Sequence, residues 1–248
     1  MLVNVKEMSG CILRAAAASC QTDILIREGK ILSAVWDNLQ EYMSGKDPQL
    51  LMLGPDAIQR SLSDQSGGMI DRIIVTTQAH YEECYDWCDL YAPELLARIE
   101  NVEDEENPQA ISLMEHYDLI PQLDELVQRY VVLRGGGFLI IQETAAMIVV
   151  DVNTGTDPSP INCNKEAAVE IARQMALRNL GGIIMIDFIN PNNKAERDAI
   201  LKTFKNATAR DACTVDVQGW TKLGLIELTR QRRTPTLMDR LRMLGLVE

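Results

Sequence analysis

The chain has 248 residues, which is enough for one large domain or two modest ones with a substantial core. Lys and Arg total 24 against 36 Asp and Glu, so the formal net charge is −12. This charge argues against generalised electrostatic binding to nucleic acid, and any such site must be a local basic patch. No apolar stretch reaches transmembrane length, so we expect a cytoplasmic protein that makes no membrane contact.

The cysteines and histidines argue against a structural zinc site. Six cysteines are scattered without a CxxC pair, and the spacing of Cys84 and Cys88 fits one face of a helix. His80 and His116 are too few for a histidine-rich metal centre. We therefore expect a reducing compartment and no zinc site in this chain.

The first half of the chain alternates short strands with helices. We predict a strand around residues 11–14 and a helix over residues 23–42, where apolar residues recur at helical spacing. A loop rich in serine and glycine, residues 63–68, marks a subdomain boundary. A strand at residues 73–75 then precedes a helical span.

That helical span covers residues 80–99 and contains Pro93, which allows two helices in place of one. A further helix is predicted over residues 121–130, before a short apolar run that leads into three consecutive glycines. The glycines lack the spacing of a phosphate-binding loop and enter a strand, so they indicate a turn or a close approach of two backbones.

The stretch from Gly135 to Gly155 organises the second half of the chain. Two apolar, β-branched runs flank a polar turn at residues 142–144, which predicts a strand, a turn and a strand bearing Asp151. A helix over residues 164–178 follows, and then a second apolar strand that ends at Asp187. Another helix, to residue 207, and two more strands complete the predicted α/β pattern.

The two aspartates are the candidate site. Neighbouring strands lie about 5 Å apart, so Asp151 and Asp187 converge if their strands are adjacent. Carboxylates in this arrangement suit magnesium or manganese, and Asn153 shares the face of Asp151. The alternative is that the aspartates only cap the helices that follow them.

A second candidate group is the basic run near the end of the chain. Lys222, Arg230 and Arg232 concentrate positive charge in an otherwise acidic sequence. They form either a solvated face or a contact with a phosphate backbone.

Several of these segments together closely resemble the ribonuclease E/G family. The resemblance is continuous over residues 134–237, with weaker similarity at residues 10–16. The segments that carry it are the following: Gly135-Gly136-Gly137, Val150-Asp151-Val152-Asn153-Thr154-Gly155, Asn164-Lys165-Glu166-Ala167-Ala168, Leu177-Arg178-Asn179-Leu180-Gly181-Gly182, Ile186-Asp187-Phe188 and Leu223-Gly224-Leu225-Ile226-Glu227-Leu228-Thr229-Arg230.

The resemblance implies a metal-dependent endoribonuclease that hydrolyses single-stranded RNA and leaves a 5′-phosphate product, in RNA processing or decay. It implies an α/β fold with a DNase I-like catalytic subdomain at residues 135–248. A smaller ribonuclease H-like piece at residues 70–134 and a 5′-sensor-like remnant at residues 1–69 would precede it. In this family the matching aspartates, Asp151 and Asp187 here, hold Mg²⁺, while Asn153 orients water or phosphate.

Departures from the family pattern leave alternatives open. Arg14 matches an arginine that binds the RNA 5′-phosphate, but Ala15 replaces its threonine partner. No segment of this sequence matches the family's OB-fold RNA-binding barrel or its zinc-link. If Met1 is the natural start, we expect a short member that forms a homo-oligomer or borrows RNA-binding surface from a protein partner; the alternative is a fragment of a longer protein. The alternative function is a non-catalytic RNA-binding or scaffold subunit, and a metal phosphoesterase acting on small nucleotides is a third.

Overall fold

The computed structural model describes residues 10–13, 17, 21–43, 47–65, 70–102, 112–209 and 211–247. The chain divides into two compact units, Met1–Ala110 and Ile111–Glu248, each of which is described by itself. No helix in the described part of the chain combines the length and the apolar character needed to cross a membrane. The predicted subdivision into pieces at residues 1–69, 70–134 and 135–248 stays a prediction.

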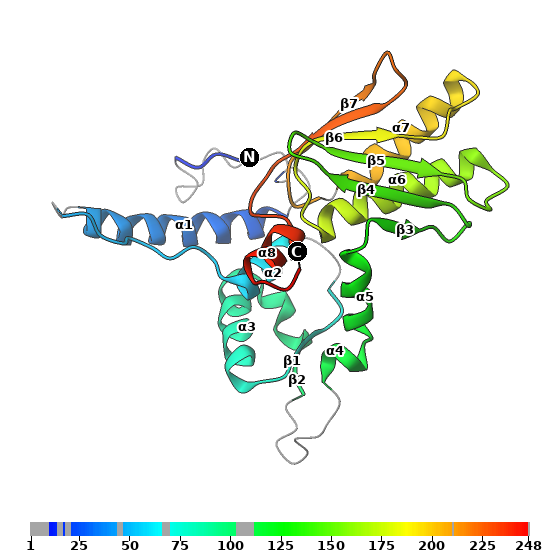
Figure 1. Cartoon of the computed structure of the whole chain (residues 1–248). Helices are drawn as coiled ribbons and strands as arrows, with labels where there is room; N and C mark the ends of the chain where they lie inside the picture. Colours follow the sequence, from blue (N-terminus) through cyan, green and yellow to red (C-terminus); the bar gives the residue numbers. More distant parts are fainter. Residues whose placement is uncertain are drawn as a thin grey trace. The chain divides into compact units, whose positions relative to one another are not determined.

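The first unit contains helices and a parallel two-stranded sheet (Figure 1). Its elements are α1 (Thr22–Met43), α2 (Ala57–Gln65), β1 (Ile73–Val75), α3 (Gln78–Tyr91), the 3₁₀ helix η4 (Pro93–Arg98) and β2 (Ile99–Asn101). The predicted helix at residues 23–42, the strand at 73–75 and the division of the 80–99 helix at Pro93 are confirmed. Proline lacks the N–H of a continuing helix, and here it occupies the first turn of η4.

The predicted strand around residues 11–14 is wrong for residues 11–13, which adopt no regular structure. The side chain of Ile12 is 93% exposed, so this apolar run has neither a core to face nor a neighbouring strand to pair with in the described part of the unit. Arg14 and Ala15 lie outside the described residues. The core of this unit instead gathers around α3 and comprises Leu62, Cys84, Cys88, Ala92, Leu95 and Ile99.

The second unit is built on a six-stranded mixed sheet (Figure 1). Its elements are α4 (Leu113–His116), α5 (Leu119–Leu126), β3 (Tyr130–Val132), β4 (Phe138–Glu143), β5 (Ile148–Asn153), α6 (Pro160–Leu177), β6 (Gly182–Asp187), α7 (Lys194–Thr208), β7 (Val215–Trp220), β8 (Ile226–Arg230) and α8 (Leu237–Met243). The strands are ordered β3-β4-β5-β6-β8-β7. Only β5 and β6 pair in parallel, and the other neighbours are antiparallel.

One face of this sheet is buried against α6 and α7. Alternate residues of the central strands face the helices, and Val150, Ile184 and Ile186 are completely buried. From α6 and α7 the core receives Ile171 and Phe204. The residues between the buried strand positions therefore lie on the opposite face, which we call the open face.

The sheet begins earlier in the chain than the motifs indicated. Strand β3 pairs with β4, with Tyr130 opposite Ile140, so it belongs to the same sheet as the strands after the glycines. For the same reason α5 ends at Leu126, four residues before the predicted end of that helix at residue 130. Helix α8 was not among the predicted elements.

The three glycines bring two backbones into close contact, as predicted. A Cβ atom on Gly137 would lie 2.5 Å from Cys163 Sγ and 2.9 Å from the backbone oxygen of Asn153. Gly136 adopts a φ of +97°, a conformation that favours glycine. Its carbonyl oxygen accepts a hydrogen bond from the Thr156 N–H at 3.0 Å. The glycine turn thus supports the loop that follows β5.

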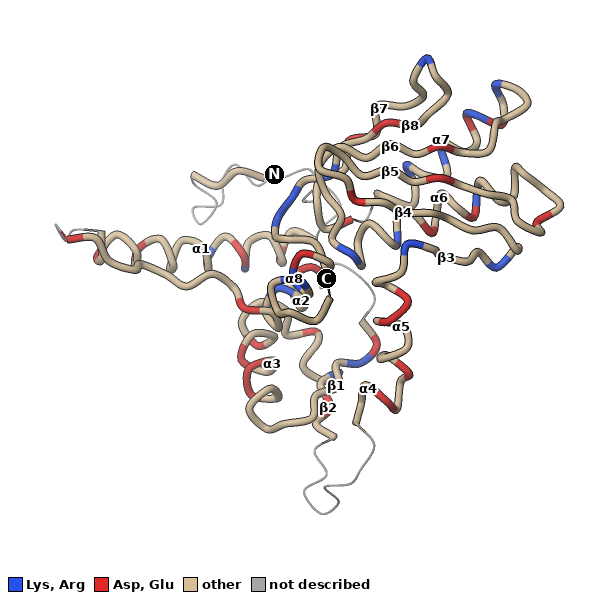
Figure 2. Tube along the Cα trace, in the orientation of Figure 1, with Lys and Arg blue, Asp and Glu red and all other residues tan. Residues whose placement is uncertain are grey.

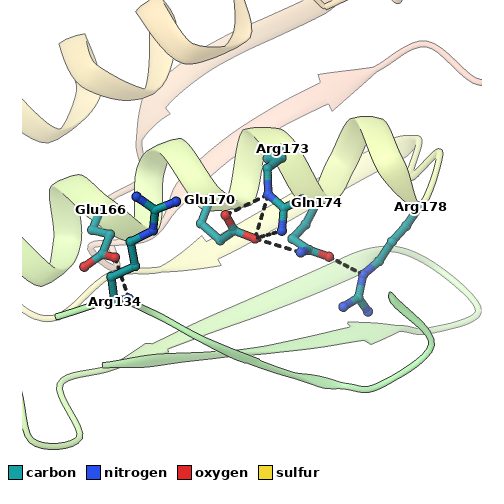
Figure 3. A network of polar contacts seen from close by, with 6 residues as sticks. All are labelled: Arg134, Glu166, Glu170, Arg173, Gln174 and Arg178. Carbon is teal, nitrogen blue, oxygen red and sulfur yellow. Dashed lines mark hydrogen bonds and ion pairs between the residues drawn. The ribbon is translucent and has the colours of Figure 1, made fainter. Parts of the chain in front are cut away.

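A polar network on α6 ties this helix to the segment before β3 and to the glycine turn (Figure 3). The Glu166 carboxylate accepts hydrogen bonds from the backbone N–H groups of Arg134, at 2.6 Å, and Gly135, at 3.0 Å. At the other end Arg178 is 4% exposed and donates to Gln174 Oε1 at 2.6 Å and to the Gln128 carbonyl oxygen at 2.7 Å. Burial lowers the pKa of Arg178. These bonds fix the helix that connects β5 to β6.

Replacing Gly137 by Ala should destabilise the protein by about 1–3 kcal/mol, because the added methyl group meets a backbone oxygen that cannot move freely. The free energy of unfolding from urea titration measures the effect. Gly54→Ala is the matched control, since its Cβ atom would have no neighbour within 4 Å. Equal stability of the two variants would contradict the close approach.

Candidate active site

Asp151 and Asp187 lie directly opposite each other on β5 and β6. The parallel register pairs the two residues, and paired residues of neighbouring strands point to the same side of a sheet, about 5 Å apart. Both alternate with buried residues, so both carboxylates are on the open face. The predicted adjacency of the two strands is confirmed, and Figure 2 shows acidic positions side by side on β5 and β6.

The two carboxylates influence each other electrostatically. Partial burial raises the pKa of Asp187, and the negative charge of Asp151 raises it further. Asn153, also on the open face, donates a hydrogen bond from Nδ2 to Asp151 Oδ2 at 2.8 Å. This bond holds the Asp151 carboxylate in one orientation. The site is therefore a like-charge pair with one oriented member.

The helix-capping alternative for the aspartates is wrong. The residue at the N-cap of α6 is Ser159, eight residues beyond Asp151. The N-cap of α7 is Asn193, whose side-chain oxygen accepts a hydrogen bond from the Glu196 N–H at 3.0 Å. Neither aspartate is therefore the N-cap residue of the helix that follows it.

The donor set fits a hydrated hard cation. In the described part of the chain no three His, Cys, Asp or Glu side chains form a group that could hold a metal ion. Mg²⁺ commonly uses only one or two protein carboxylates and completes its octahedron with water and substrate phosphate oxygens. Asp151 and Asp187 supply that number of carboxylates, and their mutual repulsion favours a cation between them.

Asn164 fixes the chain just beyond Asp187. Its side chain is 1% exposed and forms two hydrogen bonds with the backbone of Ile189. Nδ2 donates to the Ile189 oxygen at 2.7 Å, and Oδ1 accepts from the Ile189 N–H at 3.0 Å. Asn164 has no role among the residues predicted from the motifs, although a polar side chain on the apolar face of a helix is the signal for one.

The segment after Asp151 is fixed from the same helix. The Cys163 thiol lies 3.6 Å from the Asn153 carbonyl oxygen and donates to it. Burial raises the pKa of this thiol, so it remains protonated and able to donate at neutral pH. Consecutive residues at the start of α6, Cys163 and Asn164, therefore position the ends of both aspartate-bearing strands.

Among the predicted RNA-binding residues that the structure describes, Lys222 lies nearest the aspartate end of the sheet. It is exposed in the turn between β7 and β8. Because β8 runs antiparallel to β6 with Ile226 opposite Ile186, this turn lies at the end of the sheet where Asp187 stands.

Arg230 does not face solvent, contrary to its assignment to the RNA-binding group. It is 4% exposed, and its guanidinium donates to both carboxylate oxygens of Asp211 at 2.9 Å and to the Leu180 oxygen at 2.7 Å. It pairs with Gly182 at the opposite end of β6 from Asp187, roughly 16 Å along the strand. Arg230 is therefore not available to bind RNA.

Arg232 lies at the same distant end as Arg230. It is exposed, and its Nε donates to the Gly181 oxygen at 2.9 Å. The structure therefore brings Asp151, Asn153 and Asp187 together, places Lys222 at their end of the sheet, and leaves Arg232 apart. Arg14 lies outside the described residues.

Comparison with known proteins adds an independent finding. The chain matches the sequence profile of the Ribonuclease E/G family over residues 1–233. It is 35% identical over 234 residues to Ribonuclease G of Salmonella typhimurium, which is 91% of this chain and 47% of the relative. It is 34% identical, with the same coverage, to Ribonuclease G of Escherichia coli K12.

A more distant relative bears the other family name. The chain is 31% identical over 242 residues to Ribonuclease E of Synechocystis, covering 93% of this chain and 35% of the relative. The chain thus spans about half the length of the ribonuclease G relatives and about a third of this one.

Asp187→Asn should stabilise the metal-free protein at neutral pH. Between the usual carboxyl pKa and the raised pKa of Asp187, the folded state binds more protons than the unfolded state, so stability falls as pH rises through that window. We expect a Tm gain of about 1–3 °C at pH 7 that vanishes at about pH 3. Differential scanning calorimetry in EDTA measures it.

The matched control for that measurement is Asp198→Asn, an exposed position on α7, which covers the other face of the sheet. An identical Tm gain in both variants at pH 7 would show that only net charge matters and would contradict the repulsion between Asp151 and Asp187.

Asn164→Ala should lower the free energy of unfolding by about 2–4 kcal/mol, because it leaves both backbone groups of Ile189 without their partner. Asn164→Asp should also be destabilising, since the carboxylate cannot donate to the Ile189 oxygen. Asn162→Ala, an exposed position in the same helix turn, should stay within about 0.5 kcal/mol of the unaltered protein. Urea unfolding followed by circular dichroism measures all three, and a neutral Asn164→Ala would contradict the clamp.

Proposed function

This chain belongs to the ribonuclease E/G family, and from that membership we propose that it is an endoribonuclease that hydrolyses single-stranded RNA with Mg²⁺ or Mn²⁺. The observation that carries the proposal is the register of β5 and β6, which sets Asp151 opposite Asp187. We propose further that the second unit contains the DNase I-like catalytic part of the family fold, predicted at residues 135–248, and that ribonuclease H-like and sensor-like pieces precede it.

Asp151 and Asp187 would hold the divalent cation through their carboxylate oxygens. When bound there, the cation would lower the pKa of an attacking water and neutralise charge on the scissile phosphate. The Asn153 amide keeps the Asp151 carboxylate oriented, and Asn164 and Cys163 hold the two strand ends that carry the acids. The protein's part in catalysis is thus to position the acids and to concentrate negative charge where the cation is needed.

The reaction is a hydrolysis. Water forms the new bond to phosphorus, and the bond from phosphorus to the ribose 3′ oxygen breaks. The 3′ oxygen leaves as a hydroxyl group after it takes a proton, and the downstream RNA keeps a 5′-phosphate. This product follows from the family resemblance of the two aspartate motifs.

The −12 charge of the chain shapes how it would hold RNA. Phosphates are repelled by an acidic surface unless cations intervene. Lys222 supplies a local positive charge at the aspartate end of the sheet, and we propose that further RNA-binding surface comes from a second copy of the chain or from a protein partner. We place this activity in the cytoplasm, in RNA processing or decay.

The test is cleavage of a 5′-labelled, single-stranded A/U-rich RNA with Mg²⁺. Because two carboxylates share the cation, Asp151→Asn and Asp187→Asn should each reduce the cleavage rate by about a hundredfold or more. Asp216→Asn is the matched control, since Asp216 is an exposed acid on the edge strand β7, where it pairs with Thr229 of β8. It should leave the rate within about twofold of the unaltered protein.

The outcomes separate the functions considered. Cleavage that requires Mg²⁺ and is lost in both site variants supports the endoribonuclease. RNA binding without cleavage by the unaltered chain, at any Mg²⁺ or Mn²⁺ concentration tried, overturns it in favour of a scaffold subunit. Equal loss in Asp216→Asn would show that general surface charge, and not the carboxylate pair, controls the rate.

A further inference from the structure

Two aromatic side chains share the open face with the aspartates. Along β4, Leu139 is completely buried against the helices, so its neighbour Phe138 lies on the open face. Phe138 pairs with Asn153 of β5 on one side and with Val132 of β3 on the other. Tyr130 of β3 joins the same face through its pairing with Ile140, which itself pairs with Asp151.

The two rings form a contiguous pair. Their centroids lie 5.8 Å apart with an interplanar angle of 40°, which is within the range of favourable aromatic contacts. Tyr130 is 62% exposed on the edge strand β3, while Phe138 is half-buried on β4, next to Asn153 of β5. An exposed tyrosine ring supported by a second ring offers a flat apolar surface one strand further from the site.

The charge of this face indicates what such a surface could bind. Asp151 and Asp187 repel phosphate groups, except at the cation they would share. A neutral ring attracts a nucleobase through its π-face whatever the base is, and this kind of grip does not depend on positive charge. Single-stranded RNA has unpaired bases that can turn toward such a ring.

We propose that Tyr130 and Phe138 form a stacking platform for a base of the single-stranded RNA, close to the phosphate that is cleaved. The proposal rests on the proposed ribonuclease function, and in it Tyr130 and Phe138 bind the substrate beside Asp151 and Asp187. Phe138 lies on β4, about 5 Å from the strand that carries Asp151, and Tyr130 lies on β3, about 10 Å from it. A base that stacks there belongs to a nucleotide near the scissile bond.

Equilibrium binding tests the platform without cleavage. In the full chain carrying both Asp151→Asn and Asp187→Asn, binding of a fluorescein-labelled single-stranded RNA is measured by anisotropy in EDTA. Tyr130→Ala and Phe138→Ala should each weaken binding by about five- to a hundredfold. Tyr130→Phe and Phe138→Tyr keep a ring and should stay within about twofold.

Val132→Ala is the matched control, because Val132 is 81% exposed on the same strand and pairs with Phe138 but carries no ring. It should bind RNA as the double-Asn protein does. Thermal unfolding by circular dichroism confirms that each variant is folded. A loss in Val132→Ala equal to that in Tyr130→Ala would overturn the proposal, since any change to the edge strand would then suffice.

Abasic RNAs test the stacking without altering the aromatic residues. A series of oligonucleotides, each lacking one base, should show weakened binding at one or two adjacent positions. At those positions Tyr130→Ala should cause no further loss, because the missing base and the missing ring remove the same contact. Losses that add fully at every position would overturn the platform.

These measurements separate the two proposals. Metal-dependent cleavage by the unaltered chain together with unchanged binding in both alanine variants would overturn the platform and leave the ribonuclease standing. Absence of cleavage by the unaltered chain would count against the ribonuclease, whereas the abasic series would still decide whether the rings stack on RNA.

Discussion

The parallel pairing of β5 with β6 is the constraint on which the candidate site depends. It is the one parallel contact in the described sheet, and its register places Asp151 against Asp187. A shift of the register by one residue would put one carboxylate into the core, where an unpaired charge is costly. The buried residues that alternate with the acids therefore stabilise the fold and also fix the positions of the two carboxylates.

Helix α6 supplies the polar contacts that make this register rigid at the site. It forms the crossover between the two parallel strands, and its first turns hold the Asn153 oxygen through Cys163 and the Ile189 backbone through Asn164. Its next turn holds the glycine turn through Glu166. The part-buried bonds of Cys163 and Asn164 are costly to break, so one helix couples the packing of the core to the geometry of the acids.

The acidic character of the chain and an RNA substrate are compatible if positive charge and stacking are local. In the proposed function, a cation between the aspartates, Lys222 at their end of the sheet, and the neutral rings on β3 and β4 would together hold the polyanion. Arg230 does not contribute to RNA binding in this scheme, because its guanidinium forms a buried ion pair with Asp211 at the distant end of the sheet.

The sequence by itself determined the strands that carry Asp151 and Asp187, the helix between them and the family, and it limited the glycines to a turn or a close approach. Periodicity, turn residues and motif spacing are local properties. Only the tertiary structure decided which residues are buried and which strands are neighbours. It buried Arg230, excluded a strand at residues 11–13, added β3 to the main sheet and gave Asn164 its role. Burial and pairing depend on contacts between segments far apart in the chain, and a local pattern carries no information about its partner.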